Sequence, residues 1–83
     1  MSNHSGSYML NSVLETANDM GILKKIGKKK TQEFILEVLD IARHYDCNPG
    51  EILEGIGQEC GVCSCCSSAS DDIDEEGLCP KCR

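Results

Sequence analysis

Six of the seven cysteines of this 83-residue chain lie between positions 60 and 82. They form two groups, C-x2-C-x-C-C and C-P-x-C, on either side of an acidic segment. Two thiolates that are two residues apart can bind one metal ion from a tight backbone turn. Two such pairs supply a tetrahedral shell of four sulfurs, which suits zinc. The cysteine spacing therefore predicts one zinc ion in a structural site.

Two sets of four ligands fit this spacing. The fourth ligand is Cys60 in the pattern C-x2-C-x15-C-x2-C, which is the usual ribbon spacing, or Cys66 in the pattern C-x2-C-x12-C-x2-C. The spacing leaves both possibilities open, and it predicts that Cys65 is not a ligand. Three cysteines belong to both sets and are the predicted ligands in either case: Cys63, Cys79 and Cys82.

The run GVC-x2-C followed by LC-x2-C, with Pro80 inside the second pair, resembles zinc-ribbon proteins. More narrowly, it resembles the C4 zinc finger of the TraR/DksA family of RNA-polymerase-binding regulators. This resemblance implies a regulatory protein that acts in transcription through a protein partner. It also implies that zinc is held by one particular set of four cysteines: Cys63, Cys66, Cys79 and Cys82.

An iron–sulfur cluster is the alternative cofactor. Cys60, Cys63 and Cys66 form C-x2-C-x2-C, and Cys79 is followed by Pro80, as in bacterial ferredoxin motifs. The gap before Cys79 is longer than in those motifs, and it contains the open, anionic run SSASDDIDEEGL. We therefore favour zinc and keep an iron–sulfur or thiol-redox protein as the alternative.

Composition narrows the possible functions further. The net charge of −6 argues against a general affinity for nucleic acid. No apolar run approaches the length of a transmembrane helix, so we expect no membrane insertion. Seven cysteines without a secretory signal predict a reducing compartment, the cytoplasm or a eukaryotic nucleus. No nucleophile–base pattern is present, so we expect no enzymatic activity; the oligomeric state stays open.

The periodicity of apolar residues predicts three short helices. The first covers 7–20 with Ser7 as its N-cap, and the second covers 31–46 with Thr31 as its N-cap. The third starts at Asn48 and ends near residue 58. The apolar residues of the first helix share one face: Leu10, Val13, Leu14, Ala17 and Met20. The apolar stripe of the second helix is the predicted core: Phe34, Ile35, Val38, Leu39, Ala42 and Tyr45, with Ile41 at the margin.

These elements predict a small, mainly α-helical protein that ends in a zinc-ribbon or zinc-knuckle segment. A core of limited size is expected at this length, and the metal would stabilise it. The predicted organisation along the chain is a disordered N-terminus at 1–6, a helical region at 7–58 with a helix-turn-helix-like hairpin at 31–57, and a four-cysteine segment at 59–83.

A lysine-rich run, KKIGKKK, separates the first two predicted helices. It could contact an acidic partner or a phosphate, or it could be a solvated connector. The third predicted helix carries Glu51 and Glu54 and no basic residue, which disfavours DNA recognition by the hairpin. A protein partner is therefore expected, and a nucleic-acid-binding regulator is the alternative. The candidate contact residues are Lys24, Lys25, Lys28, Lys29 and Lys30.

Overall fold

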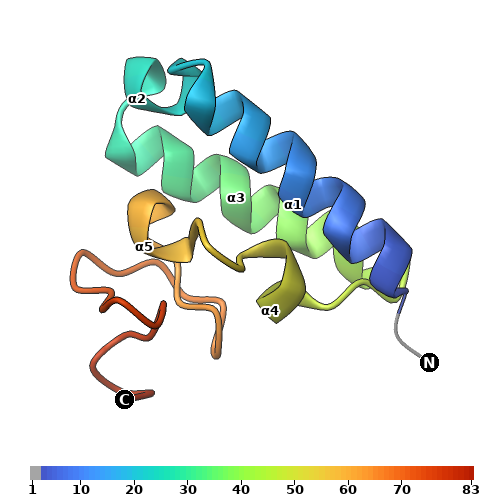
Figure 1. Cartoon of the computed structure of the whole chain (residues 1–83). Coiled ribbons are helices and arrows are strands. Elements are labelled where there is room, and N and C mark those ends of the chain that lie inside the picture. Colours follow the sequence, from blue (N-terminus) through green and yellow to red (C-terminus); the bar gives the residue numbers. More distant parts are fainter. Residues whose placement is uncertain (1–2) are drawn as a thin grey trace.

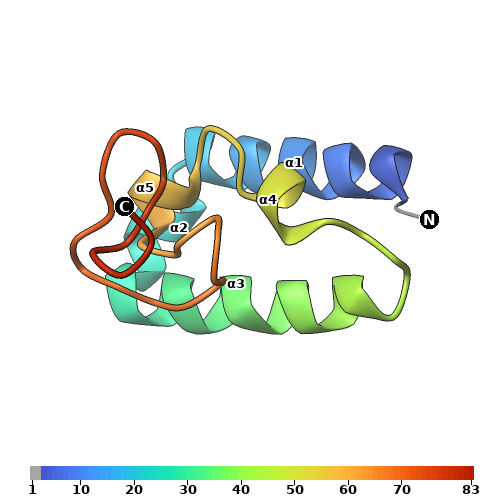
Figure 2. The ribbon, with the colours of Figure 1, turned by 90° about the horizontal axis from the view of Figure 1, so that it is seen from below.

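The computed structural model describes residues 3–83, which form five helices and a C-terminal segment without regular structure (Figure 1). The long helices α1 and α3 run antiparallel, and α2 lies in the connection between them. Helices α4 and α5 lie on one side of this pair (Figure 2). No helix among residues 3–83 combines the length and apolar character needed to cross a bilayer. The bounds are α1 His4–Asp19, α2 Ile22–Ile26, α3 Lys28–Arg43, α4 Pro49–Ile52 and α5 Gly57–Cys60.

Helix α1 begins earlier than the sequence predicts. Asn3, not Ser7, is the N-cap, and its Oδ1 accepts a hydrogen bond from the Gly6 amide at 2.9 Å. The backbone amide of Asn3 also donates to the Asp46 carbonyl at 2.6 Å, which ties the start of α1 to the turn after α3. Within the segment 1–6, for which the sequence predicts disorder, Asn3 thus caps α1 and residues 4–6 belong to it, while residues 1–2 lie outside the described part.

Helix α3 also begins before its predicted start. Its N-cap is Gly27, whose φ of +90° allows the chain to leave α2 and enter α3 without a longer loop. Thr31 is not the cap; it lies inside the helix and is buried. Its Oγ1 donates a hydrogen bond to the Leu23 carbonyl at 2.8 Å, so it joins α3 to α2.

The third predicted helix starts where expected but is divided in two. Asn48 caps α4, because its Oδ1 accepts a hydrogen bond from the Gly50 amide at 2.8 Å. The helix ends at Ile52, and Gly55 has a φ of +81°, which interrupts regular helix. The chain resumes as α5 and then stops at Gly61, with a φ of +74°. Residues 31–57 thus contain one long helix and a single helical turn.

The core lies between the α1–α3 pair and the segment that follows it. Leu14, Ile35 and Leu39 pack there with Ile52 and Val62 from the other side. Because α4, α5 and the C-terminal segment cover only one side of the pair, the other side of each apolar stripe stays open. Some residues of the predicted core are therefore exposed, a correction that applies to Phe34 and Tyr45 and also to the marginal Ile41. Val13 and Met20, on the apolar face of α1, are exposed as well.

Candidate metal centre

The first cysteine pair lies on a tight turn after α5. The Cys63 amide donates to the Ser68 carbonyl at 2.9 Å, and the Ser67 amide donates to the Cys63 carbonyl at 2.9 Å. Ser67 has a φ of +59°, which reverses the chain directly after Cys66. A single antiparallel bridge between Val62 and Ala69 closes the turn. This geometry brings two thiols that are three positions apart onto the same side of the loop.

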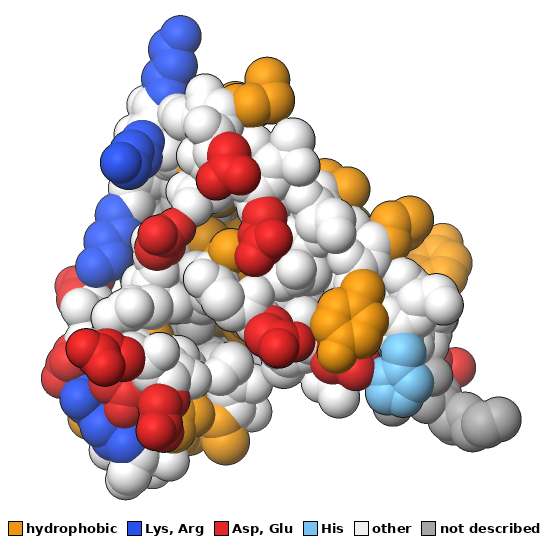
Figure 3. All heavy atoms as spheres, viewed as in Figure 1, with side chains coloured by type: hydrophobic (Ala, Val, Ile, Leu, Met, Phe, Trp, Pro, Cys, Tyr) orange, Lys and Arg blue, Asp and Glu red, His pale blue; other side chains and the backbone are white. Residues whose placement is uncertain are grey.

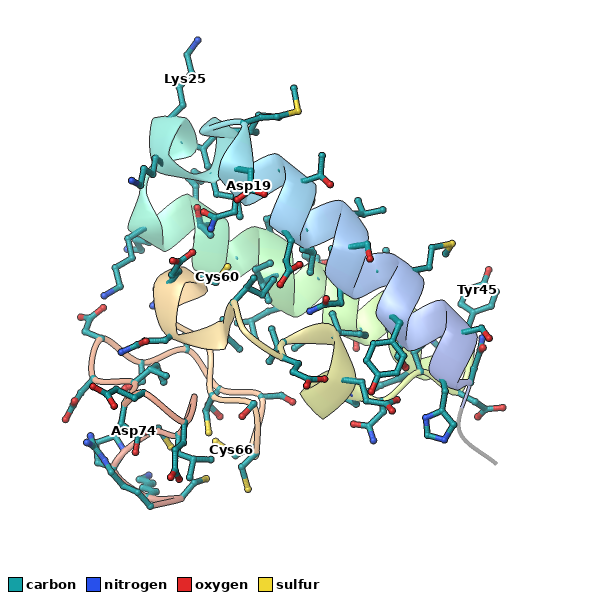
Figure 4. All side chains as sticks on the ribbon, in the orientation of Figure 1. Asp19, Lys25, Tyr45, Cys60, Cys66 and Asp74 are labelled. Carbon is teal, nitrogen blue, oxygen red and sulfur yellow. The ribbon has the colours of Figure 1, made fainter. Side chains whose placement is uncertain are left out.

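The second cysteine pair forms a similar turn at the C-terminus. The amides of Cys82 and Arg83 both donate to the Cys79 carbonyl, at 3.0 and 3.2 Å. The two turns are held together by the Ser64 amide and hydroxyl, which donate to the Gly77 carbonyl at 2.8 and 3.0 Å. Figure 4 shows Cys66 in the cysteine segment that lies below the helices.

Four thiol sulfurs meet where the two turns face each other. The sulfurs all lie within 4.8 Å of one another, and the structure has none of its cysteines in a disulfide. Cys66 Sγ and Cys79 Sγ are 3.7 Å apart. Zn–S bonds of about 2.3 Å in a tetrahedron require sulfurs about 3.8 Å apart, so the arrangement fits one ion. The group that could hold a metal consists of Cys63, Cys66, Cys79 and Cys82.

Backbone amides favour the anionic form of the central sulfur. Burial of Cys63 opposes ionisation, but the amides of Cys66 and Cys79 donate to its Sγ at 3.5 and 3.4 Å. These contacts lower the pKa of Cys63 to about 6. The Ser68 hydroxyl lowers the pKa of Cys66, whereas the neighbouring thiols, Cys63 first, raise the pKa of Cys82. A cation would offset this crowding of negative charge around the last thiol.

The other two cysteines of the cluster region lie outside this group. Cys60 ends α5, is buried against the helices, and belongs to the hydrophobic core (Figure 4). Burial first, and the Glu59 carboxylate second, raise the pKa of Cys60 to about 11. Cys65 is exposed and is not among the four clustered thiols. The structure thus brings together the set with Cys66, because the turn at Gly61 separates Cys60 from the two loops.

A glutamine attaches the cysteine segment to the helices. Gln32 lies on α3, and its Nε2 donates to the Gly61 carbonyl at 3.0 Å and to the Ser70 carbonyl at 3.4 Å. Nearby, Lys28 Nζ lies 3.6 Å from a carboxylate oxygen of Asp71. The sequence did not indicate this role of Gln32, because the position of a single polar residue in a helix does not show what its side chain contacts. Its amide positions the segment on which the four thiols lie.

The candidate lysines gather at one end of the molecule. Figure 3 shows basic side chains along the edge formed by α2 and the start of α3, and Figure 4 shows Lys25 pointing into solvent. All five lysines are exposed. Two of them pair with carboxylates, Lys28 with Asp71 and Lys30 with Glu33 at 3.4 Å. The remaining ones, Lys24, Lys25 and Lys29, make no ion pair with any residue of 3–83.

A hollow of about 670 Å³ separates this lysine end from α5. Its wall includes two of the lysines and two carboxylates, with apolar groups beneath them. The lining residues are Asn18, Asp19, Leu23, Lys24, Lys28, Thr31, Glu59 and Cys60. The sequence did not indicate this hollow, since its residues come from four separate stretches of the chain.

No protein-family model, curated protein or solved structure matches this chain.

Proposed function

We propose that the protein is a zinc-stabilised regulatory adaptor that binds a protein partner at its lysine end, in transcription. The observation that carries the proposal is the group of four thiols, which lies between two turns and beside the helices. Four sulfur ligands complete a tetrahedral shell and leave no position for a substrate. The metal would therefore stabilise the fold, and the activity would lie on the surface.

The arrangement of the thiols favours zinc over an iron–sulfur cluster. A ferredoxin-type site needs Cys60, Cys63 and Cys66 as consecutive ligands, but Cys60 is buried in the core. Sulfurs within 4.8 Å of one another suit a single ion, whereas a four-iron core holds its thiolates farther apart. When bound, zinc would lock the two turns together, and Cys63, Cys66, Cys79 and Cys82 would hold it as thiolates.

The charge distribution favours an acidic protein segment as the partner. The chain has a net charge of −6, yet five lysines lie within seven positions of one another. A nucleic acid that approached Lys28 would also meet Asp71 and the acidic loop that follows it. A short acidic segment of a protein can contact the lysines without meeting that loop. The role in transcription is supported by the resemblance of the cysteine motif to the TraR/DksA zinc finger.

Metal analysis tests the first half of the proposal. Protein purified without added metal is examined by elemental analysis, native mass spectrometry and visible absorbance. We expect about one zinc ion per chain and no visible absorbance. Bound iron, with or without sulfide, would replace the zinc assignment by the iron–sulfur or redox alternative.

Binding to purified bacterial RNA polymerase tests the second half. Labelled, zinc-loaded protein is titrated with the polymerase, and we expect saturable binding that Lys29→Glu weakens. Arg43→Glu is the matched control, because it reverses an exposed basic residue at the other end of α3. Equal affinities of the two variants would remove the lysine end from the interface. Failure of the polymerase to bind, or tight binding of duplex DNA at physiological salt instead, would refute the adaptor role in transcription.

A further inference from the structure

The side of the α1–α3 pair that faces away from α4 and α5 is apolar and uncovered. We call it the open face and define it by six exposed side chains and the three partly buried ones between them. The exposed ones are Met9, Val13, Met20, Phe34, Ile41 and Tyr45, whose exposed fractions run from 45% to 71%. The partly buried ones are Leu10, Ala17 and Val38. In Figure 3, apolar side chains follow the upper right edge of the molecule, over α1, whereas the acidic side chains lie over its centre and lower left.

The size of this face matches a protein–protein interface. Six large apolar side chains that expose on the order of 100 Å² each present about 600 Å² of apolar surface in total. The largest apolar patch on a typical monomer is about 300–600 Å², and a stable interface buries about 800 Å² per partner. The open face is therefore at the upper limit for a monomer and close to what a dimer interface requires.

The side chains of α1 have sizes that would fit those of a second α1 helix packed against it at Val13. In an antiparallel pair of α1 helices with Val13 at the two-fold axis, positions equally far before and after Val13 meet. Met9 then lies opposite Ala17 of the second copy, and Met20 lies opposite Gly6 of the second copy. A large side chain thus faces a small one at both positions. The helix edge beside these residues carries Ser5, Ser12 and Thr16, so no like charges meet.

The charges of α3 complement themselves about the same axis. Val13 is six residues before the end of α1, and Phe34 is six residues after the start of α3, so we expect the two at similar levels of the antiparallel helices. When the axis passes α3 between Glu33 and Phe34, the rotation that pairs α1 with its copy places Lys30 opposite Glu37 of the second copy, since the two residues are equally far from that point. Glu37 makes no ion pair within residues 3–83. Beside Phe34, a hollow of about 510 Å³ leaves room for the second phenylalanine.

We infer that the open face binds a second copy of this chain, which gives a two-fold symmetric bundle of two α1 and two α3 helices. This inference goes beyond the adaptor role, and the dimer would present one lysine end and one metal centre at each of its two ends. Lys24, Lys25, Lys28 and Lys29 and the four clustered thiols lie outside the open face.

The test is the mass of the zinc-loaded full chain in solution, by sedimentation velocity and light scattering at about 100 μM. We expect twice the chain mass of 9.0 kDa. Val13→Glu should weaken dimerisation at least about 100-fold, because it brings two carboxylates together in an apolar contact. Gln58→Glu is the matched control, since it adds the same charge at an exposed position of α5, outside the open face, and it should remain a dimer.

A charge reversal tests the register. Lys30→Glu and Glu37→Lys should each raise the dissociation constant about threefold, and the double variant should restore it. A mass of 9.0 kDa for the wild type, equal behaviour of Val13→Glu and Gln58→Glu, or no restoration in the double variant would overturn the inference. Circular dichroism checks that each variant is folded. Polymerase binding by a chain that stays monomeric would reject the dimer and leave the adaptor role standing.

Discussion

The amide of Cys79 donates a hydrogen bond to the sulfur of Cys63 at 3.4 Å, across 16 positions of the chain. The Cys66 amide contacts the same sulfur at 3.5 Å. One sulfur therefore accepts hydrogen bonds from both cysteine turns. This shared acceptor means that the two turns depend on each other, and that the four thiols form one site and not two independent pairs.

Cys79→Ser should lose most of the bound zinc, whereas Cys65→Ser and Cys60→Ser should keep about one ion per chain. Cys79 is one of the four clustered thiols, and its loss leaves an incomplete shell around a doubly charged ion. Cys65 is exposed and Cys60 lies in the core, and neither belongs to that group. Zinc content by elemental analysis makes the comparison. Loss of zinc from Cys60→Ser with retention in Cys66→Ser would select the other set of ligands.

Removal of zinc with a chelator should unfold the segment 61–83 before the helices. This segment has a single β-bridge and few backbone hydrogen bonds of its own, so it depends on the metal. Structural zinc contributes on the order of 10 kcal/mol in small zinc-finger peptides, which exceeds the stability of most domains of this size. Limited proteolysis followed by mass spectrometry measures the effect. Equal protection of residues 61–83 with and without chelator would show that no metal holds the segment.

The zinc-loaded protein should lose stability between about pH 9 and pH 11 through Cys60. Burial raises the pKa of Cys60 from 9.0 to about 11, so the folded chain holds this proton more tightly than the unfolded chain. The contribution is complete below pH 9 and is lost as the pH rises through 11. Cys60→Ala should lower stability overall but flatten this decline. Denaturant unfolding at several pH values measures both slopes, and parallel slopes would contradict the assignment.

Ser7→Ala should lower the free energy of unfolding by about 1–3 kcal/mol. The Ser7 hydroxyl is buried; it accepts a hydrogen bond from the Asn48 amide at 2.7 Å and donates to the Asn3 carbonyl at 2.9 Å. Alanine would leave the Asn48 amide without this acceptor. Ser5→Ala is the matched control on the exposed side of α1 and should change stability by less than about 0.5 kcal/mol. A change as small for Ser7→Ala as for Ser5→Ala would show that this contact contributes little.

Local patterns in the sequence predicted a good part of the fold. The helical character of 31–46 followed from apolar residues at three- and four-residue steps, and α3 covers most of that range. The start of α4 followed from Asn48 and Pro49, whose capping chemistry acts within a few residues. A possible metal site near the C-terminus followed from the cysteine spacing, since the four clustered thiols are among those that the spacing selected.

Tertiary packing decided what local patterns left open. The spacing allowed either Cys60 or Cys66 beside the other three thiols, and the turn at Gly61 placed Cys60 in the core. The apolar stripe of α3 contained both Ile35 and Phe34, yet only Ile35 is buried. Periodicity shows which residues share a side of a helix, but not how much of that side a neighbour covers. Here α4, α5 and the cysteine segment cover one side of the α1–α3 pair, and the open face is what remains.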